Sequence, residues 1–195
     1  MRKKILGIII SMLLTATILP MTAFAGDPEN PEIKDELNDT DLLFLDIESA
    51  WFYENADEPE FLYTALKVHS LSLKINAVYS IRWTYNGKEY VAGFDTYTFR
   101  ENVFRSGDPK RATNWQWKSM PECEGIIDQN MKIITWKILK SNIGNPEKGD
   151  VLTNTKAAAV PGFPISFLSF FIGRDFRDFA PSVQDEYGLD YNIQY

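Results

Sequence analysis

The segment Tyr79-Ser-Ile-Arg-Trp-Thr-Tyr85, followed by Asn86-Gly87 and then by Lys88 to Phe94, decides the fold class of this chain. Alternate positions of the first run are apolar or aromatic, which is typical of a β-strand with one buried face. Asn-Gly accepts positive φ at both central positions of a tight turn, whose twist matches that of the flanking strands. The sequence therefore predicts a β-hairpin in which Trp83 faces a core between two sheets.

Short apolar or alternating runs of the same kind lie on both sides of this hairpin. We expect further strands at Phe44 to Tyr53, Phe61 to Val68, Tyr97 to Phe104, Met131 to Leu139 and Asp190 to Tyr195. Helix is scarce, and the aromatic clustering of its best candidate, Pro164 to Phe171, suits a buried segment. The pattern predicts an all-β fold, an antiparallel β-sandwich of the jelly-roll-like type with little helix.

Residues 1–25 have the three parts of a secretory signal peptide. Basic residues at positions 2–4 precede an apolar run from Ile5 to Leu19, and Ala23-Phe24-Ala25 supplies the small residues of a cleavage site. The run of about 15 residues is shorter than the roughly 20 needed to span a bilayer. We therefore expect cleavage after Ala25, no stable transmembrane span afterwards, and a protein that is secreted or held at the cell surface.

The rest of the chain divides into two parts by composition. Residues 26–41 are rich in Pro, Asp, Glu and Asn, and Pro28 and Pro31 disfavour regular structure, so we expect an extended acidic lead-in. Residues 42–195 carry the strand pattern and suit one β-sandwich domain.

The charge balance limits the classes of partner. Removing the three basic residues of the signal from the 20 in the chain leaves 17 against 27 acidic residues, a net charge of −10 for the mature protein. Nucleic acid and anionic membrane surfaces repel such a protein, so neither is an expected partner.

The residues that usually carry nucleophilic catalysis are scarce. His69 is the only histidine and Cys123 the only cysteine, which excludes an internal disulfide and multi-histidine zinc sites. We expect His69 to lie at a strand end, and the carboxylates that flank Cys123 to raise the pKa of its thiol. We therefore expect no catalytic residues, although paired carboxylates leave a small hydrolase open as an alternative.

The order of several motifs is similar to that of a known group of exported domains. Pro31 to Asp35, then Asp46-Ile-Glu-Ser-Ala-Trp-Phe52, then Phe61 to Val68 and Trp83 to Gly87 resemble β-sandwich domains of the DOMON and family-9 carbohydrate-binding-module type. The resemblance implies a jelly-roll-like sandwich that binds sugars, haem or other surface ligands without catalysis.

Two aromatic residues indicate a surface for ligands. Trp115 and Trp117 lie in a polar stretch, and alternate spacing places both side chains on one side if the segment is extended. With Tyr97 they would form a platform for stacking on sugar rings. The other interpretation, in which both rings cap the end of the core, stays open.

The acidic lead-in contains a candidate calcium site and a candidate glycosylation site. Asp35, Asp39 and Asp41 offer carboxylate oxygens, the ligands that Ca²⁺ prefers, although the spacing is not that of an EF-hand. The alternative is a solvated acidic segment. Asn38-Asp39-Thr40 is a sequon for N-glycosylation in an exported protein.

These features favour a secreted, non-catalytic module that binds carbohydrate or another extracellular ligand. The main alternative is a structural or adhesion domain that contacts other cell-surface proteins, and the carboxylate-based hydrolase is the third. No cofactor is expected other than calcium.

Overall fold

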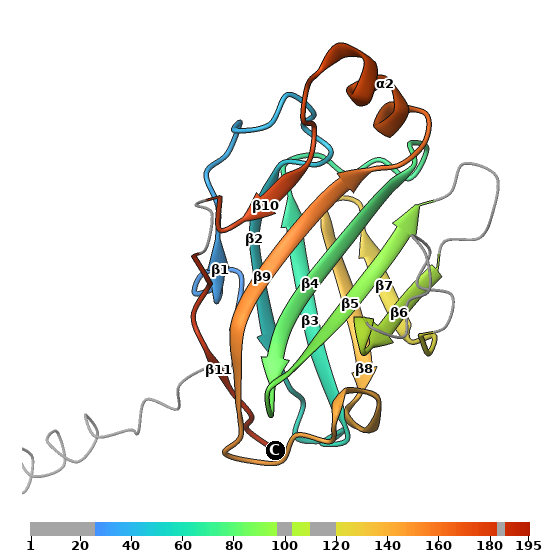
Figure 1. Ribbon diagram of the computed structural model, residues 1–195. Helices are drawn as coiled ribbons and strands as arrows, with labels where there is room; N and C mark the ends of the chain where they lie inside the picture. The colour runs from blue at the N-terminus through green and yellow to red at the C-terminus, as the bar shows by residue number, and fades with distance from the viewer. Residues whose placement is uncertain (1–25, 97–102, 110–119, 183–185) are drawn as a thin grey trace, which may run out of the picture.

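The computed structural model describes residues 26–96, 103–109, 120–182 and 186–195 (Figure 1). Strands account for 46% of the structure and helices for 9%, which confirms the predicted all-β class with little helix. The predicted signal peptide, residues 1–25, lies outside the described residues. No helix within the described ranges is both long enough and apolar enough to cross a membrane.

Two antiparallel sheets pack against each other. The first sheet has the strand order β1-β2-β3-β8-β7. Its strands are β1 (Ile33–Lys34), β2 (Ile47–Tyr53), β3 (Phe61–Val68), β8 (Ile133–Leu139) and β7 (Glu124–Asp128).

The second sheet has the strand order β10-β9-β4-β5-β6, and β11 pairs with β9. Its strands are β10 (Asp178–Ala180), β9 (Val151–Pro161), β4 (Ala77–Tyr85), β5 (Lys88–Thr96), β6 (Val103–Gly107) and β11 (Tyr191–Asn192). The chain returns β8 to the side of β3 in one sheet and β9 to the side of β4 in the other. Consecutive strands β3 and β4, and likewise β8 and β9, therefore lie in different sheets, and this alternation gives the jelly-roll-like connectivity.

The predicted hairpin is confirmed. Strands β4 and β5 pair from Ala77↔Thr96 to Tyr85↔Lys88, and Asn86 and Gly87 both have positive φ, at 48° and 69°. Positive φ at both positions defines the turn that Asn-Gly favours.

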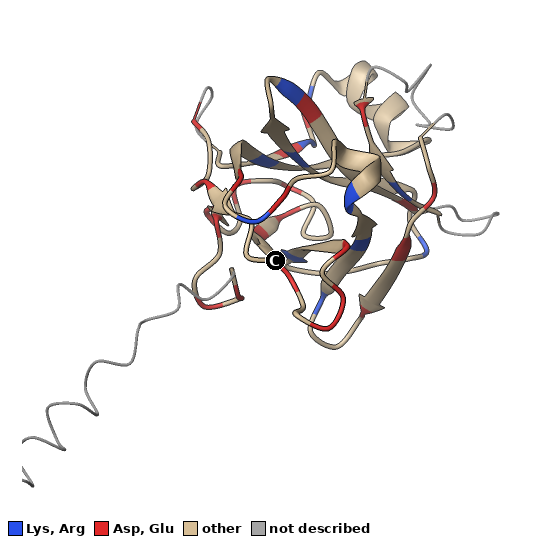
Figure 2. Ribbon diagram, turned by 90° about the horizontal axis from the view of Figure 1, so that it is seen from below, with Lys and Arg blue, Asp and Glu red and all other residues tan. Residues whose placement is uncertain are grey.

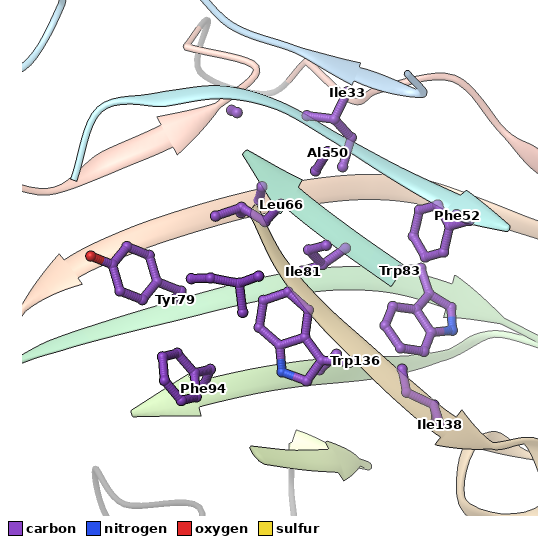
Figure 3. Close-up of a cluster of buried hydrophobic side chains, with 14 of the residues drawn as sticks. Ile33, Ala50, Phe52, Leu66, Tyr79, Ile81, Trp83, Phe94, Trp136 and Ile138 are labelled. Atoms are coloured by element: carbon purple, nitrogen blue, oxygen red, sulfur yellow. The ribbon is translucent and has the colours of Figure 1, made fainter. Parts of the chain in front are cut away.

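The core lies between the inner faces of the two sheets, as Figure 3 shows. Trp83 of β4 is fully buried, with its ring centroid 5.6 Å from that of Phe52 on β2 in an edge-to-face arrangement. Trp136 of β8 is also fully buried, and its ring meets Phe104 of β6 edge to face at 6.1 Å. The predicted inner face of β4 is therefore confirmed, since aromatic side chains from both sheets interlock there.

The structure differs from the sequence-based expectations at several elements, since β7, β9 and β10 form where no strand was expected. The short strand β1 forms within the expected extended lead-in, and its Ile33 is fully buried in the core. The expectation of a buried segment near Pro164 is wrong, because none of the residues of α2 (Ile165–Ile172) is buried. This helix belongs to the connection between β9 and β10, at one end of the sandwich (Figure 1).

Candidate functional site

The outer face of the second sheet forms a groove. Because side chains alternate along a strand, burial of Tyr79, Ile81 and Trp83 on the inner face sends Ser80 and Arg82 of β4 outward. The small side chains of Ser80 and Ala158, paired across β4 and β9, form part of the floor. Because these two side chains are small, they leave space above the sheet for a ligand.

Two adjoining cavities make up this groove, of about 590 Å³ and 720 Å³. They share Val78, Val160 and Phe179, so they run into each other along β4, β9 and β10. Phe179 is 47% exposed and Tyr187, at the edge of the first cavity, is 52% exposed. We call this surface the outer groove.

The charges that line the outer groove balance. It is lined by the basic residues Arg82, Lys156 and Arg177 and by the acidic residues Glu89, Asp95 and Asp175. Arg82 pairs with Glu89 at 3.1 Å and Arg177 with Asp175 at 2.6 Å. A neutral ligand therefore suits the groove better than a polyanion does.

Aromatic rings and cations lie together in the groove. The ammonium group of Lys156 lies 4.2 Å from the ring centroid of Tyr187, and the guanidinium group of Arg177 lies 5.4 Å from that of Phe179. These contacts restrain both rings at the rim while each ring stays about half exposed.

A second cluster lies at the edge where the two sheets meet. Asp35, Asp39 and Asp178 each place a carboxylate oxygen within 4.8 Å of the other two. We call these three residues the acidic corner. The backbone N–H of Ile47 on β2 donates to Asp178 at 2.6 Å, and that of Ser182 donates to Asp35 at 3.0 Å. The corner therefore joins the N-terminal segment to β10.

Burial shifts the protonation of this corner. Desolvation is the largest cause, and it raises the pKa of Asp178 to about 7 and that of Asp35 to about 6. The pKa of Asp39 is raised as well, first by desolvation and then by the carboxylate of Asp46. Outside the corner, desolvation raises the pKa of Glu32 to about 7.

We expect the protein in a chelating buffer to be more stable at about pH 5 than at about pH 7.5. Between the ordinary carboxyl pKa of about 4 and the raised values in the folded protein, the folded state binds more protons than the unfolded state, so stability falls as pH rises. Thermal unfolding at the two pH values measures this slope. The variant Glu32→Gln should flatten it, and a higher unfolding temperature at pH 7.5 would contradict the assignment.

The predicted site residues have different outcomes. Asp35 and Asp39 do lie together, but the third carboxylate beside them is Asp178, which lies far from them in the sequence. Asp41 instead forms an exposed ion pair with Arg174 at 2.9 Å. Trp115, Trp117 and Tyr97 lie outside the described residues, so the stacking platform stays a prediction.

The remaining predictions concern single residues. Asn38 is exposed with a φ of 67°, and its glycosylation stays a prediction. His69 follows the end of β3, as expected, with Nδ1 3.8 Å from a carboxylate oxygen of Asp46. The pKa of the Cys123 thiol is raised to about 11, but the main cause is burial and not the neighbouring carboxylates.

Sequence reasoning missed Asp178, Phe179 and Tyr187. Neighbouring residues on a strand face opposite sides, so β10 places Asp178 toward the first sheet and Phe179 toward the outer groove. The alternation of Asp178 and Phe179 could be predicted only if the strand itself were recognised. The strand has three residues and no distinctive sequence pattern.

No protein-family model matches the chain, and neither a curated protein nor a solved structure matches it. The resemblance to DOMON-like and family-9 carbohydrate-binding domains therefore stays a prediction. The assignment of the fold as a β-sandwich depends on the strand order of its two sheets.

Proposed function

We propose that this protein is an exported, non-catalytic binding module whose outer groove holds a neutral carbohydrate. The observation that carries the proposal is the groove itself, which combines two half-exposed aromatic rings, Phe179 and Tyr187, with polar side chains of balanced charge. Aromatic faces stack on the apolar faces of sugar rings, while polar groups around them hydrogen-bond hydroxyl groups.

The distribution of charge supports a neutral ligand. Figure 2 shows basic and acidic positions interspersed over the sandwich and not separated onto two faces. A polyanion would need an excess of lysine and arginine along the groove, because its binding depends on the number of charges that the protein neutralises. The outer groove has no such excess among its described residues.

The test is affinity electrophoresis of Phe179→Ala and Tyr187→Ala in gels that contain soluble xylan, β-glucan or galactomannan. We expect the wild type to be retarded by at least one of these, and each variant to lose at least about tenfold in affinity, since a stacking ring is a large part of such a contact. Both side chains are about half exposed, so unfolding free energies should change by only about 0.5 kcal/mol.

The matched control is Tyr195→Ala, a ring that is 47% exposed and does not line the outer groove. It should bind like the wild type. Loss of binding in Trp115→Ala/Trp117→Ala, with none in the groove variants, would move the site to the platform expected from the sequence. A wild type that no polysaccharide retards would reject carbohydrate as the ligand.

One observation favours the alternative, contact with another cell-surface protein. The segment around α2 exposes Phe163, Phe167, Leu168, Phe170, Phe171 and Ile172, each more than half accessible to solvent. Contiguous apolar surfaces of this kind are typical of protein contacts. The same electrophoresis separates the two functions, because contact with a protein alone gives no saturable polysaccharide signal.

A further inference from the structure

We propose that the acidic corner binds one Ca²⁺ ion, which fastens the N-terminal segment to β10. Two of its carboxylates, Asp35 and Asp39, come from the N-terminal segment, and the third, Asp178, comes from the last part of the chain. Each of the three offers a carboxylate oxygen within 4.8 Å of the other two, so the group combines residues from both segments.

Unpartnered buried oxygens beside the corner point to a ligand. Asp46 is fully buried; its Oδ2 accepts the backbone N–H of Asn38, the residue before Asp39, at 2.9 Å. Its Oδ1 is buried without a hydrogen-bond partner among the described residues, as is Oδ2 of Asp35. A buried carboxylate oxygen without a hydrogen-bond partner raises the free energy of the folded state. A bound cation with its water ligands would supply the missing partner.

The concentration of carboxylates around the corner favours a bound cation. Besides the three aspartates of the corner, the fully buried carboxylate of Asp46 lies next to this segment through its hydrogen bond with the N–H of Asn38, and a basic group near it is His69, with Nδ1 at 3.8 Å. At neutral pH this concentration of negative charge favours either protons or a divalent ion.

The donor atoms favour Ca²⁺ over other divalent ions. The group consists of carboxylate oxygens and contains neither histidine nor cysteine, which suits a hard cation and not Zn²⁺. Ca²⁺ accepts irregular arrangements of carboxylate oxygens, whereas Mg²⁺ requires near-octahedral geometry and releases its water ligands reluctantly.

The experiment is a calorimetric titration of CaCl₂ into chelator-treated protein, with thermal unfolding in parallel. We expect one saturable site per chain, and an unfolding temperature that rises with Ca²⁺ more than with the same concentration of Mg²⁺. Absence of binding heat together with an unchanged unfolding temperature at millimolar Ca²⁺ would overturn the site.

The variants Asp178→Asn and Asp39→Asn test the ligands. Each should weaken Ca²⁺ binding by at least about tenfold, because loss of even an outer partner of a metal site costs that much. The amide oxygen introduced by Asp178→Asn would still accept the N–H of Ile47, and Asp39 is exposed, so both variants should fold. In chelator both should be at least as stable as the wild type, because each removes a repelling charge.

The matched control is Asp41→Asn, which changes an exposed carboxylate of the same segment that already pairs with Arg174. It should leave the Ca²⁺ affinity unchanged. An equal loss in Asp41→Asn, or full affinity in both corner variants, would overturn the assignment of the ligands.

Discussion

Replacing Trp83 by alanine should lower the free energy of unfolding by about 3 to 5 kcal/mol, the range for large-to-small changes at buried aromatic positions. The side chain is fully buried, and its ring meets Phe52 of the other sheet at 5.6 Å and Tyr90 of the neighbouring strand at 6.4 Å. The loss therefore removes contacts within one sheet and across the core. Urea denaturation followed by circular dichroism measures it.

The control is Trp83→Phe. This change keeps a ring in the core and removes the indole N–H, which is buried without a hydrogen-bond partner among the described residues. We expect a loss of only about 1 kcal/mol, because the cost of the smaller ring is partly offset by removal of an unsatisfied donor. If Trp83→Ala itself costs less than about 1 kcal/mol, β4 presents its other face to the core.

Replacing Lys140 by methionine should also cost about 3 to 5 kcal/mol, because it leaves the carboxylate of Glu54 buried without its charge partner. The Lys140 ammonium lies 2.6 Å from Oε1 of Glu54, and their side chains are only 6% and 0% exposed. Oε2 of Glu54 accepts the hydroxyl of Tyr191 at 3.1 Å and the backbone N–H of Gln194 at 2.5 Å. The pair therefore helps to hold the C-terminal strand β11 against the sandwich.

Urea denaturation of a double-mutant cycle tests this pair. The variant Lys140→Met/Glu54→Gln removes both charges, so it should be more stable than Lys140→Met alone. Arg174→Met, which breaks the exposed pair with Asp41, should cost less than about 1 kcal/mol. Equal losses in the buried and exposed pairs would show that Lys140 is not shielded from water.

Local rules were sufficient to predict several strands. β3 spans Phe61–Val68, the range expected from its apolar pattern, and the β4–β5 hairpin forms around Asn86 and Gly87. In each case the deciding interactions are between neighbours in sequence. A period of two determines which side chains share a face, and the turn residues accept the backbone angles that the hairpin needs.

Strand β9 (Val151–Pro161) shows where local rules were insufficient. No strand was expected there, and its sequence contains Ala157, Ala158 and Ala159, a residue type that is depleted in strands. The structure places β9 between β4 and β10, where cross-strand pairing on both sides outweighs this weak preference. Alanine at Ala158 also keeps the outer groove open.

Residues close together in the chain were enough to predict the all-β class, the inward face of β4 and the presence of Asp35 and Asp39 in one segment. Long-range packing was needed to show that Asp178 completes the acidic corner and that Phe179 joins Tyr187 at the outer groove. These contacts depend on the position of β10 at the edge of the second sheet, where Asp178 accepts the backbone N–H of Ile47 on β2. Pairing of distant strands is selected by the total burial of both sheets, a quantity that no short stretch of sequence carries.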